Sequence, residues 1–213
     1  MVQDARKFKY SSDYPQPLVV YRNQFTLTAP AGSDVALIRF KHNLPYAPLI
    51  IGKRSDTSDF AVSQDINSVG YDDRNYVEYY VDSEYINFLF VHLDKTLATM
   101  YVRVLGFAPP DYDGDITLIQ NDSTFRLNTD NDYLGVYKQG TLTQQTGNQV
   151  SHGLGYAPQA RAWNLVHRYV TNPSIDVTGY TGVNVVTDSQ KITVPSFDSN
   201  TTKGYYQIYT TEA

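Results

Sequence analysis

Two of the four histidines occupy equivalent positions in a repeated heptapeptide, and histidine is a common general base and metal ligand. The first copy, His42–Pro48, reads HNLPYAP and the second, His152–Pro158, reads HGLGYAP, with five of seven positions identical. Catalysis would require a partner group, yet there is no Gly-x-Ser-x-Gly nucleophile motif and no acidic residue at a helical or hairpin spacing. We therefore interpret both histidines as structural residues that donate to a backbone carbonyl. No catalytic residue, metal ligand or cofactor site is predicted.

The repeated heptapeptide is predicted to be a turn rather than part of a strand. It follows a run of alternating residues that ends at Lys41, and it precedes another run that begins near Leu49. Each final proline favours an extended conformation at the alanine before it. Each tyrosine is expected to cover an apolar end of the fold. The fixed positions of this structural motif are His42, Leu44, Tyr46, Pro48, His152, Leu154, Tyr156 and Pro158.

A second candidate site is the acidic segment that carries Asp111, Asp113 and Asp115. Alternate carboxylates are typical of calcium loops, but an EF-hand requires glycine at its sixth position and glutamate at its twelfth. Those positions hold Ile116 and Asp122 here. We interpret the segment as a solvated linker, with an interdomain calcium site as the alternative.

A third candidate site is a group of tyrosines, which if exposed would form an aromatic platform for a sugar or a protein. Strand alternation places Tyr76 and Tyr80 on one face and Tyr79 on the other, with Tyr71 nearby. At least one of these faces is therefore expected to be core. The lone tryptophan, Trp163, aligns with Ile50 or Ile51 of the first copy and is expected to be buried.

Composition excludes several classes of protein. The chain of 213 residues has no cysteine, which rules out disulfide scaffolds, cysteine zinc sites, iron–sulfur clusters and thiol nucleophiles. Its formal net charge of −5 argues against a nucleic-acid binder, although a local basic patch remains compatible with that charge. No stretch approaches the roughly 18 apolar residues of a transmembrane helix, and the N-terminus has no apolar signal region. We expect folding in a cytoplasm, without nucleic-acid or membrane partners.

The sequence around the heptapeptide repeats in the same order in both halves. Val20-Tyr21-Arg22 corresponds to Val136-Tyr137-Lys138 upstream, and Asp82-Ser83 corresponds to Asp188-Ser189 downstream. We interpret this order as a tandem duplication of a unit of about one hundred residues, a normal size for a small domain. The predicted organisation is one domain over 1–107, a proline-containing linker over 108–115 and a second domain over 116–213.

Each half is predicted to be a β-sandwich. The 19 tyrosines favour strands, and segments such as Val35–Phe40 and Met100–Leu105 alternate with period two. Turn-forming residues separate many short runs, whereas no window predicts an amphipathic helix of three turns. The fold class is therefore all-β, with two tandem β-sandwich domains related by internal duplication. The last strand, Tyr205–Thr210, is expected to be an edge available for docking.

The repeated pattern resembles a module of structural proteins in tailed-bacteriophage virions. The resemblance rests on a Phe-[Lys/Arg]-x-[Ser/Asn]-[Ser/Thr]-Asp segment, a Val-Tyr strand end and a His-x-Leu-x-Tyr-x-Pro turn. These segments are Phe8–Asp13, Val20–Tyr21 and His42–Pro48 in the first half, and Phe125–Asp130, Val136–Tyr137 and His152–Pro158 in the second. The resemblance implies a virion protein that is assembled in the cytoplasm of a bacterial host.

Two functions follow as hypotheses. The first is a non-enzymatic structural component of the tail, the collar or the capsid surface, which assembles with other virion proteins and forms a homo-oligomer. The alternative is a carbohydrate- or host-receptor-binding module of a phage tail, in which the tyrosine group stacks against sugars. An enzyme is disfavoured, because no spacing in the sequence supports a nucleophile with its base or a pair of catalytic carboxylates.

Overall fold

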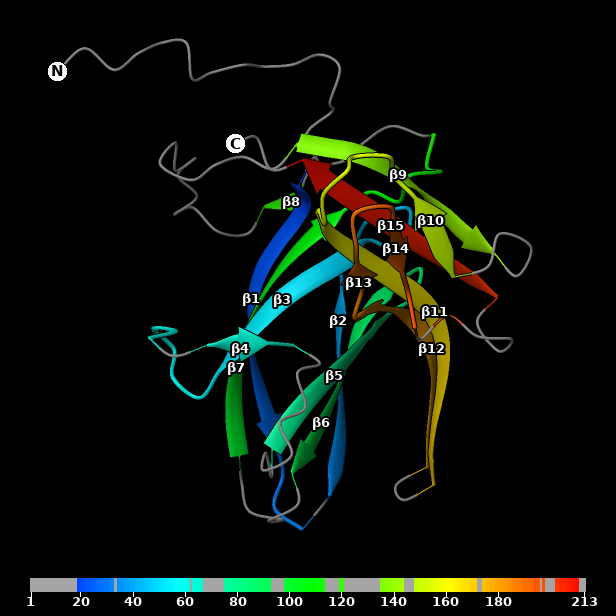
Figure 1. Ribbon diagram of the computed structural model, residues 1–213. Helices are drawn as coiled ribbons and strands as arrows, with labels where there is room; N and C mark the ends of the chain where they lie inside the picture. The colour runs from blue at the N-terminus through cyan, green and yellow to red at the C-terminus, as the bar shows by residue number, and fades with distance from the viewer. Residues whose placement is uncertain are drawn as a thin grey trace, which may run out of the picture.

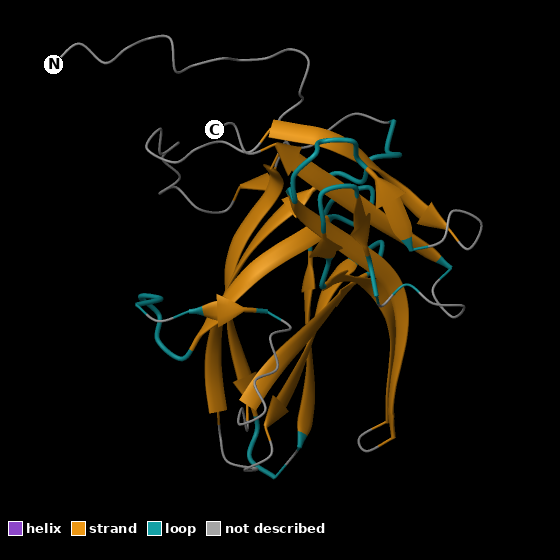
Figure 2. Cartoon of the chain, in the orientation of Figure 1, coloured by secondary structure: helices purple, strands orange, loops and turns teal. Residues whose placement is uncertain are grey.

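The computed structural model describes residues 19–32, 34–61, 63–66, 75–92, 98–113, 119–120, 135–143, 148–171, 174–195, 197 and 202–210. Every regular element in these ranges is a β-strand, which confirms the all-β class (Figures 1 and 2). The strands are β1 (Val19–Ala29), β2 (Val35–Lys41), β3 (Leu49–Ser55), β4 (Gln64–Asp65), β5 (Asn75–Val81), β6 (Tyr85–His92), β7 (Ala98–Phe107), β8 (Ile119–Gln120), β9 (Gly135–Thr143), β10 (Gln149–Ser151), β11 (Gln159–Thr171), β12 (Ser174–Val183), β13 (Val186–Thr187), β14 (Lys191–Thr193) and β15 (Lys203–Thr210).

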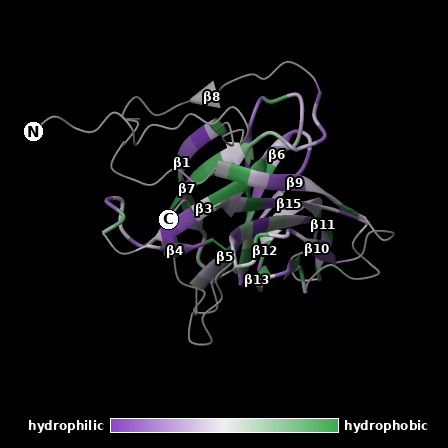
Figure 3. Cartoon of the chain, turned by 45° about the horizontal axis from the view of Figure 1, so that its top comes forward, coloured by the Kyte–Doolittle hydropathy of each residue, from purple (hydrophilic) through white to green (hydrophobic). Residues whose placement is uncertain are grey.

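The first half of the chain forms a sandwich between two antiparallel layers. One layer has the order β4-β3-β7-β1, and the other has the order β2-β6-β5. Alternation along β7 explains the packing, because Val102 and Val104 are buried between the layers while Arg103 between them is exposed. Aromatic rings fill the centre, where Phe25 stacks on Phe40 and lies beside Phe88. Figure 3 shows hydrophilic and hydrophobic stretches along strands of both halves.

The second half forms a smaller sandwich with the same arrangement. Strands β12, β11, β15 and β9 form one layer, and β10, β14 and β13 form the other. Leu142, Ile192 and Ile208 are fully buried between these layers. The order β3-β7-β1 in the first half thus corresponds to β11-β15-β9 in the second, and β2-β6-β5 corresponds to β10-β14-β13. The two halves thus share one order of strands, and the tandem duplication stays a prediction.

The two sandwiches share one sheet. Strands β2, β6 and β5 continue into β12, β11, β15 and β9 as a single seven-stranded sheet, in which Val81 of β5 pairs with Tyr180 of β12. A Cβ atom on Gly179 would lie 2.7 Å from the Val81 backbone nitrogen, so glycine permits this close approach. The segment 108–115, predicted as a linker, begins directly after β7, and β8 beyond it pairs in parallel with β1.

The prediction that the last strand is a free edge is wrong. β15 lies inside the seven-stranded sheet, between β11 and β9, and pairs with both along most of its length. β15 has the place in its layer that β7 has in the first half, where β7 is also a central strand. The edges of the seven-stranded sheet are β2 and β9.

Candidate functional site

The first heptapeptide is closed by a clasp between His42 and the turn that joins β5 to β6. His42 Nε2 lies 3.1 Å from the carbonyl oxygen of Asp82, and His42 Nδ1 accepts a hydrogen bond of 3.1 Å from the Leu44 N–H. The His42 N–H donates to the Glu84 carbonyl at 3.2 Å. Because Nδ1 is an acceptor here, the proton is on Nε2 and the ring is neutral.

The second heptapeptide has the same clasp. His152 Nε2 lies 3.0 Å from the carbonyl oxygen of Asp188, the Leu154 N–H donates to His152 Nδ1 at 3.1 Å, and the His152 N–H donates to the Gln190 carbonyl at 3.0 Å. The contact between histidine and carbonyl that the sequence predicts is thus present in both copies. Since backbone groups occupy both nitrogens of each ring, neither ring can act as a base or a ligand unless its turn opens.

The aspartates Asp82 and Asp188 complete the two clasps, a role that the sequence repeat did not reveal. Each carboxylate accepts hydrogen bonds from the N–H groups two and three residues later, at 2.7 Å for both in Asp82 and at 2.7 and 2.8 Å in Asp188. These bonds lower the pKa of Asp188. Burial opposes them at Asp82, but together with the Asn87 amide they still lower its pKa.

Backbone conformation explains one difference between the two heptapeptides. The residue after each histidine is left-handed, with φ of 56° at Asn43 and 73° at Gly153, and asparagine and glycine tolerate this region best. Gly155 is left-handed as well, with φ of 77°. The first copy has Pro45 there, whose ring fixes φ at a negative value, so the two turns differ at this position.

Acid is expected to destabilise the fold through His42. Burial lowers the pKa of this ring, against the raising effect of its bond to Asp82. The unfolded chain therefore binds a proton first, so the stabilising contribution is complete above about pH 6.5 and is lost as the pH falls towards the lowered folded pKa. Urea unfolding between pH 7.5 and 5 measures this decline. A His42→Gln variant should lose about 1–3 kcal/mol at pH 7.5 and decline less across the window, and equal slopes would contradict the assignment.

The tyrosines of the two heptapeptides lie in different surroundings. Tyr46 is 7% exposed, and its ring packs against Tyr112 with the ring centroids 4.1 Å apart. Tyr112 belongs to the segment 108–115, which therefore covers the first heptapeptide instead of only linking the two halves. Tyr156 is 39% exposed. The predicted covering role thus differs between the copies.

The group of tyrosines does not form an exposed platform. Tyr79 and Tyr80 are 2% and 5% exposed, and Tyr76 is half-buried. Tyr79 belongs to the core of the first sandwich, whereas Tyr80 packs on the opposite face of β5 against Ile175 of the β11–β12 hairpin. Both faces are therefore core, and the two buried rings present no face to a sugar. Tyr71 lies outside the described residues.

The acidic segment is engaged by the second half of the chain. Asp111 Oδ2 lies 2.6 Å from Lys203 Nζ. Burial acts to raise the pKa of the Asp111 carboxyl and the pair with Lys203 acts to lower it, and the net shift is downward. Asp113 is exposed, and Asp115 lies outside the described residues. Across the part of the chain that the structure describes, no group of three histidine, aspartate or glutamate side chains is placed to hold a metal.

The contact between the two sandwiches centres on one carbonyl group. Trp163 Nε1 of β11 donates to the Ile50 oxygen of β3 at 2.7 Å, and the Tyr79 hydroxyl donates to the same oxygen. The Gly182 N–H of β12 donates to the Tyr79 hydroxyl oxygen at 2.9 Å. Burial raises the pKa of Tyr79, which is thus a neutral donor. Trp163 is 1% exposed, as the sequence predicts, but its partner in the other half was not foreseen.

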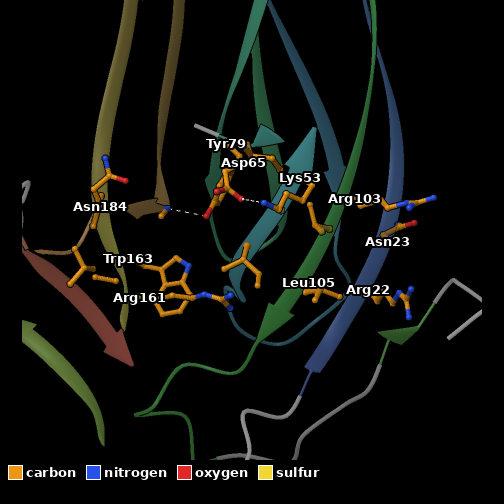
Figure 4. A pocket seen from close by; sticks show the side chains of 18 of the residues that line it. Arg22, Asn23, Lys53, Asp65, Tyr79, Arg103, Leu105, Arg161, Trp163 and Asn184 are labelled. Carbon is orange, nitrogen blue, oxygen red and sulfur yellow. Dashed lines mark hydrogen bonds and ion pairs between the residues drawn. The ribbon is translucent and has the colours of Figure 1, made fainter. Parts of the chain in front are cut away.

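Beside this contact lies a groove of about 1240 Å³, shown in Figure 4. Its floor is the outer face of β1, β7 and β3, and its wall comes from β11, β12 and the residues that follow β12. Four cationic side chains line it, whereas Asp65 is the one carboxylate among the lining residues that the structure describes. The cations are Arg22, Lys53, Arg103 and Arg161. A local basic patch is compatible with the net charge, but nothing in the residue order singles out these four cations.

No family model, curated protein or solved structure matches the chain. The resemblance to virion proteins of tailed phages therefore stays a prediction. The described ranges also contain no helix with the length and apolar character needed to cross a membrane.

Proposed function

We propose that the chain is a non-enzymatic structural component of a tailed-phage virion, which acts by assembly with other proteins. The observation that carries this proposal is the use of the repeated histidines. In both copies the ring nitrogens bind a backbone carbonyl and a backbone N–H, so the residues best suited to chemistry serve to hold turns. The motif that resembles the virion module therefore has a structural role here.

The groove between the sandwiches supports a role in protein binding. Its volume exceeds the roughly 300–1,000 Å³ that is typical of small-molecule sites, and it is formed by both halves of the chain. The carbohydrate-binding alternative depends on exposed tyrosines, and the burial of Tyr79 and Tyr80 removes two of the four candidates.

Localisation on particles tests this proposal. We expect mass spectrometry of purified phage particles to detect the chain, immunogold electron microscopy to place it at the tail, the collar or the capsid surface, and light scattering to show an oligomer of the isolated chain. A monodisperse monomer that neither occurs in particles nor cosediments with them would overturn the proposal.

A further inference from the structure

The basic groove contrasts with the acidic character of the whole chain. The formal net charge is −5, yet four cations line the groove with Asp65, which pairs with Lys53 at 2.7 Å. Asp59 lies on the neighbouring loop, and its pKa is lowered mainly by the Thr57 hydroxyl and, to a smaller degree, by Arg103. Even with Asp59 included, the cations outnumber the carboxylates among the residues of this region that the structure describes. Such a local excess attracts an anionic ligand, whereas the remainder of the surface repels one.

Arg103 is held in place by contacts with two uncharged side chains, Gln24 and Phe60. Its Nε donates to Gln24 Oε1 at 2.9 Å, and its guanidinium lies 4.0 Å from the centre of the Phe60 ring. Phe60 has a φ of 58°, an outlying value for a bulky residue, and its N–H donates to Thr57 O at 3.2 Å. The loop between β3 and β4 thus accepts backbone strain in a conformation that places this ring on Arg103. Strain of this kind often accompanies preorganised binding sites.

The floor of the groove holds a polar row beside a mixed row. Arg103 is paired across strands with Gln24 and Lys53, which makes one polar row. The next row on the same face holds Leu105 between Arg22 and Ile51. Neighbouring strands lie about 4.8 Å apart, and residues two apart on a strand are separated by about 6.7 Å. Side chains at residues i and i+2 of an extended polypeptide lie on one face with this second spacing, so a carboxylate at i can meet the cations while an apolar side chain at i+2 lies over Leu105.

We propose that this groove binds an extended acidic segment of a partner protein, in which carboxylates and apolar side chains alternate along one face, at every second residue. The proposal rests on the assembly function and adds the chemistry of the partner. A nucleic acid or a neutral sugar fits less well, because the two large aromatic side chains that line the groove, Tyr79 and Trp163, are buried and offer no stacking face. Arg161 from β11 supplies a cation from the opposite wall and lies over the Tyr209 ring at 5.6 Å.

Fluorescence anisotropy with a labelled peptide of Glu-Ser-Leu-Ser repeats, which places glutamate and leucine alternately on one face when extended, tests the proposal on the full chain. We expect saturable binding that weakens steeply as sodium chloride rises from 50 to 500 mM, because exposed charge pairs are screened. Replacing every glutamate of the peptide by glutamine should weaken binding at least about tenfold. The same loss is expected when the glutamate peptide binds a Lys53→Glu/Arg103→Glu variant of the protein.

An Arg39→Glu variant is the matched control, since Arg39 is exposed on β2 and does not line the groove. We expect its affinity to stay within about twofold of wild type. Equal binding of the glutamine peptide, no binding of the glutamate peptide, or tighter binding of oligothymidylate or dextran sulfate would each overturn the proposal. The peptide comparison uses the unaltered protein, so its result does not depend on how the variants fold. Failure here, with the chain still found on particles, would remove the groove and leave the assembly function.

Discussion

Replacing Trp163 by alanine is expected to lower the free energy of unfolding by about 3–5 kcal/mol, the usual cost of removing a large buried aromatic side chain. Trp163 is 1% exposed and packs with Leu49, Phe107 and Tyr205, residues that come from both halves of the chain. The change also removes one of the two donors to the Ile50 carbonyl. Urea unfolding followed by far-UV circular dichroism measures the effect, because the variant lacks the only tryptophan.

A Trp163→Phe variant separates packing from hydrogen bonding. It keeps most of the buried aromatic area but loses the bond to Ile50, so we expect a smaller cost of about 1–2 kcal/mol. Exposed Tyr169 offers a control on the same strand, and Tyr169→Ala should change stability by less than about 0.5 kcal/mol. A loss below about 1 kcal/mol for Trp163→Ala would show that the two halves do not depend on this contact.

The sequence predicted the elements of this fold better than it predicted how they join. Period-two alternation identifies strands such as β7 because Val102 and Val104 face a core while Arg103 faces outward. The repeat also predicted correctly that the two heptapeptides form equivalent turns. Their hydrogen bonds involve only a histidine and one neighbouring hairpin. Local rules of this kind can be read from residue order alone.

The shared sheet depends on contacts that no local pattern contains. β5 and β12 meet through one pair, Val81 with Tyr180, and the approach requires Gly179 at a position where the sequence shows only a glycine in a run of strand formers. The wrong assignment of β15 as an edge has the same origin. A strand at the end of the chain need not be an edge, and β15 has the same central place between its neighbours as β7 has in the first half.

The groove was missed for a related reason. Its cations come from four different strands, namely β1, β3, β7 and β11, and no strand contributes more than one of them. Only the cross-strand register of β1, β7 and β3, together with the position of β11, brings them to one surface. The tyrosine group shows the opposite case, because Tyr79 and Tyr80 are neighbours in sequence and, as the alternation predicts, lie on opposite faces of β5 in different cores.

Equivalent substitutions in the two heptapeptides are expected to have unequal effects. Tyr46→Ala should lower the free energy of unfolding by about 3 kcal/mol, because it leaves a cavity beneath Tyr112, whereas Tyr156→Ala should cost less than about 0.5 kcal/mol. The difference follows from exposure, which is 7% for Tyr46 and 39% for Tyr156. Urea unfolding of the two variants and of wild type at one pH measures both values.

A Tyr46→Phe variant removes only the hydroxyl group, so its comparison with Tyr46→Ala isolates the packing contribution of the ring. This hydroxyl is buried and has no hydrogen-bond partner among the described residues, so Tyr46→Phe should be neutral or stabilising by up to about 1 kcal/mol. Because Tyr112 belongs to the segment 108–115, a Tyr112→Ala variant should reproduce part of the loss seen with Tyr46→Ala. Equal losses for Tyr46→Ala and Tyr156→Ala would instead mean that the segment 108–115 adds nothing to the first heptapeptide, and that both copies are stabilised by the clasp alone.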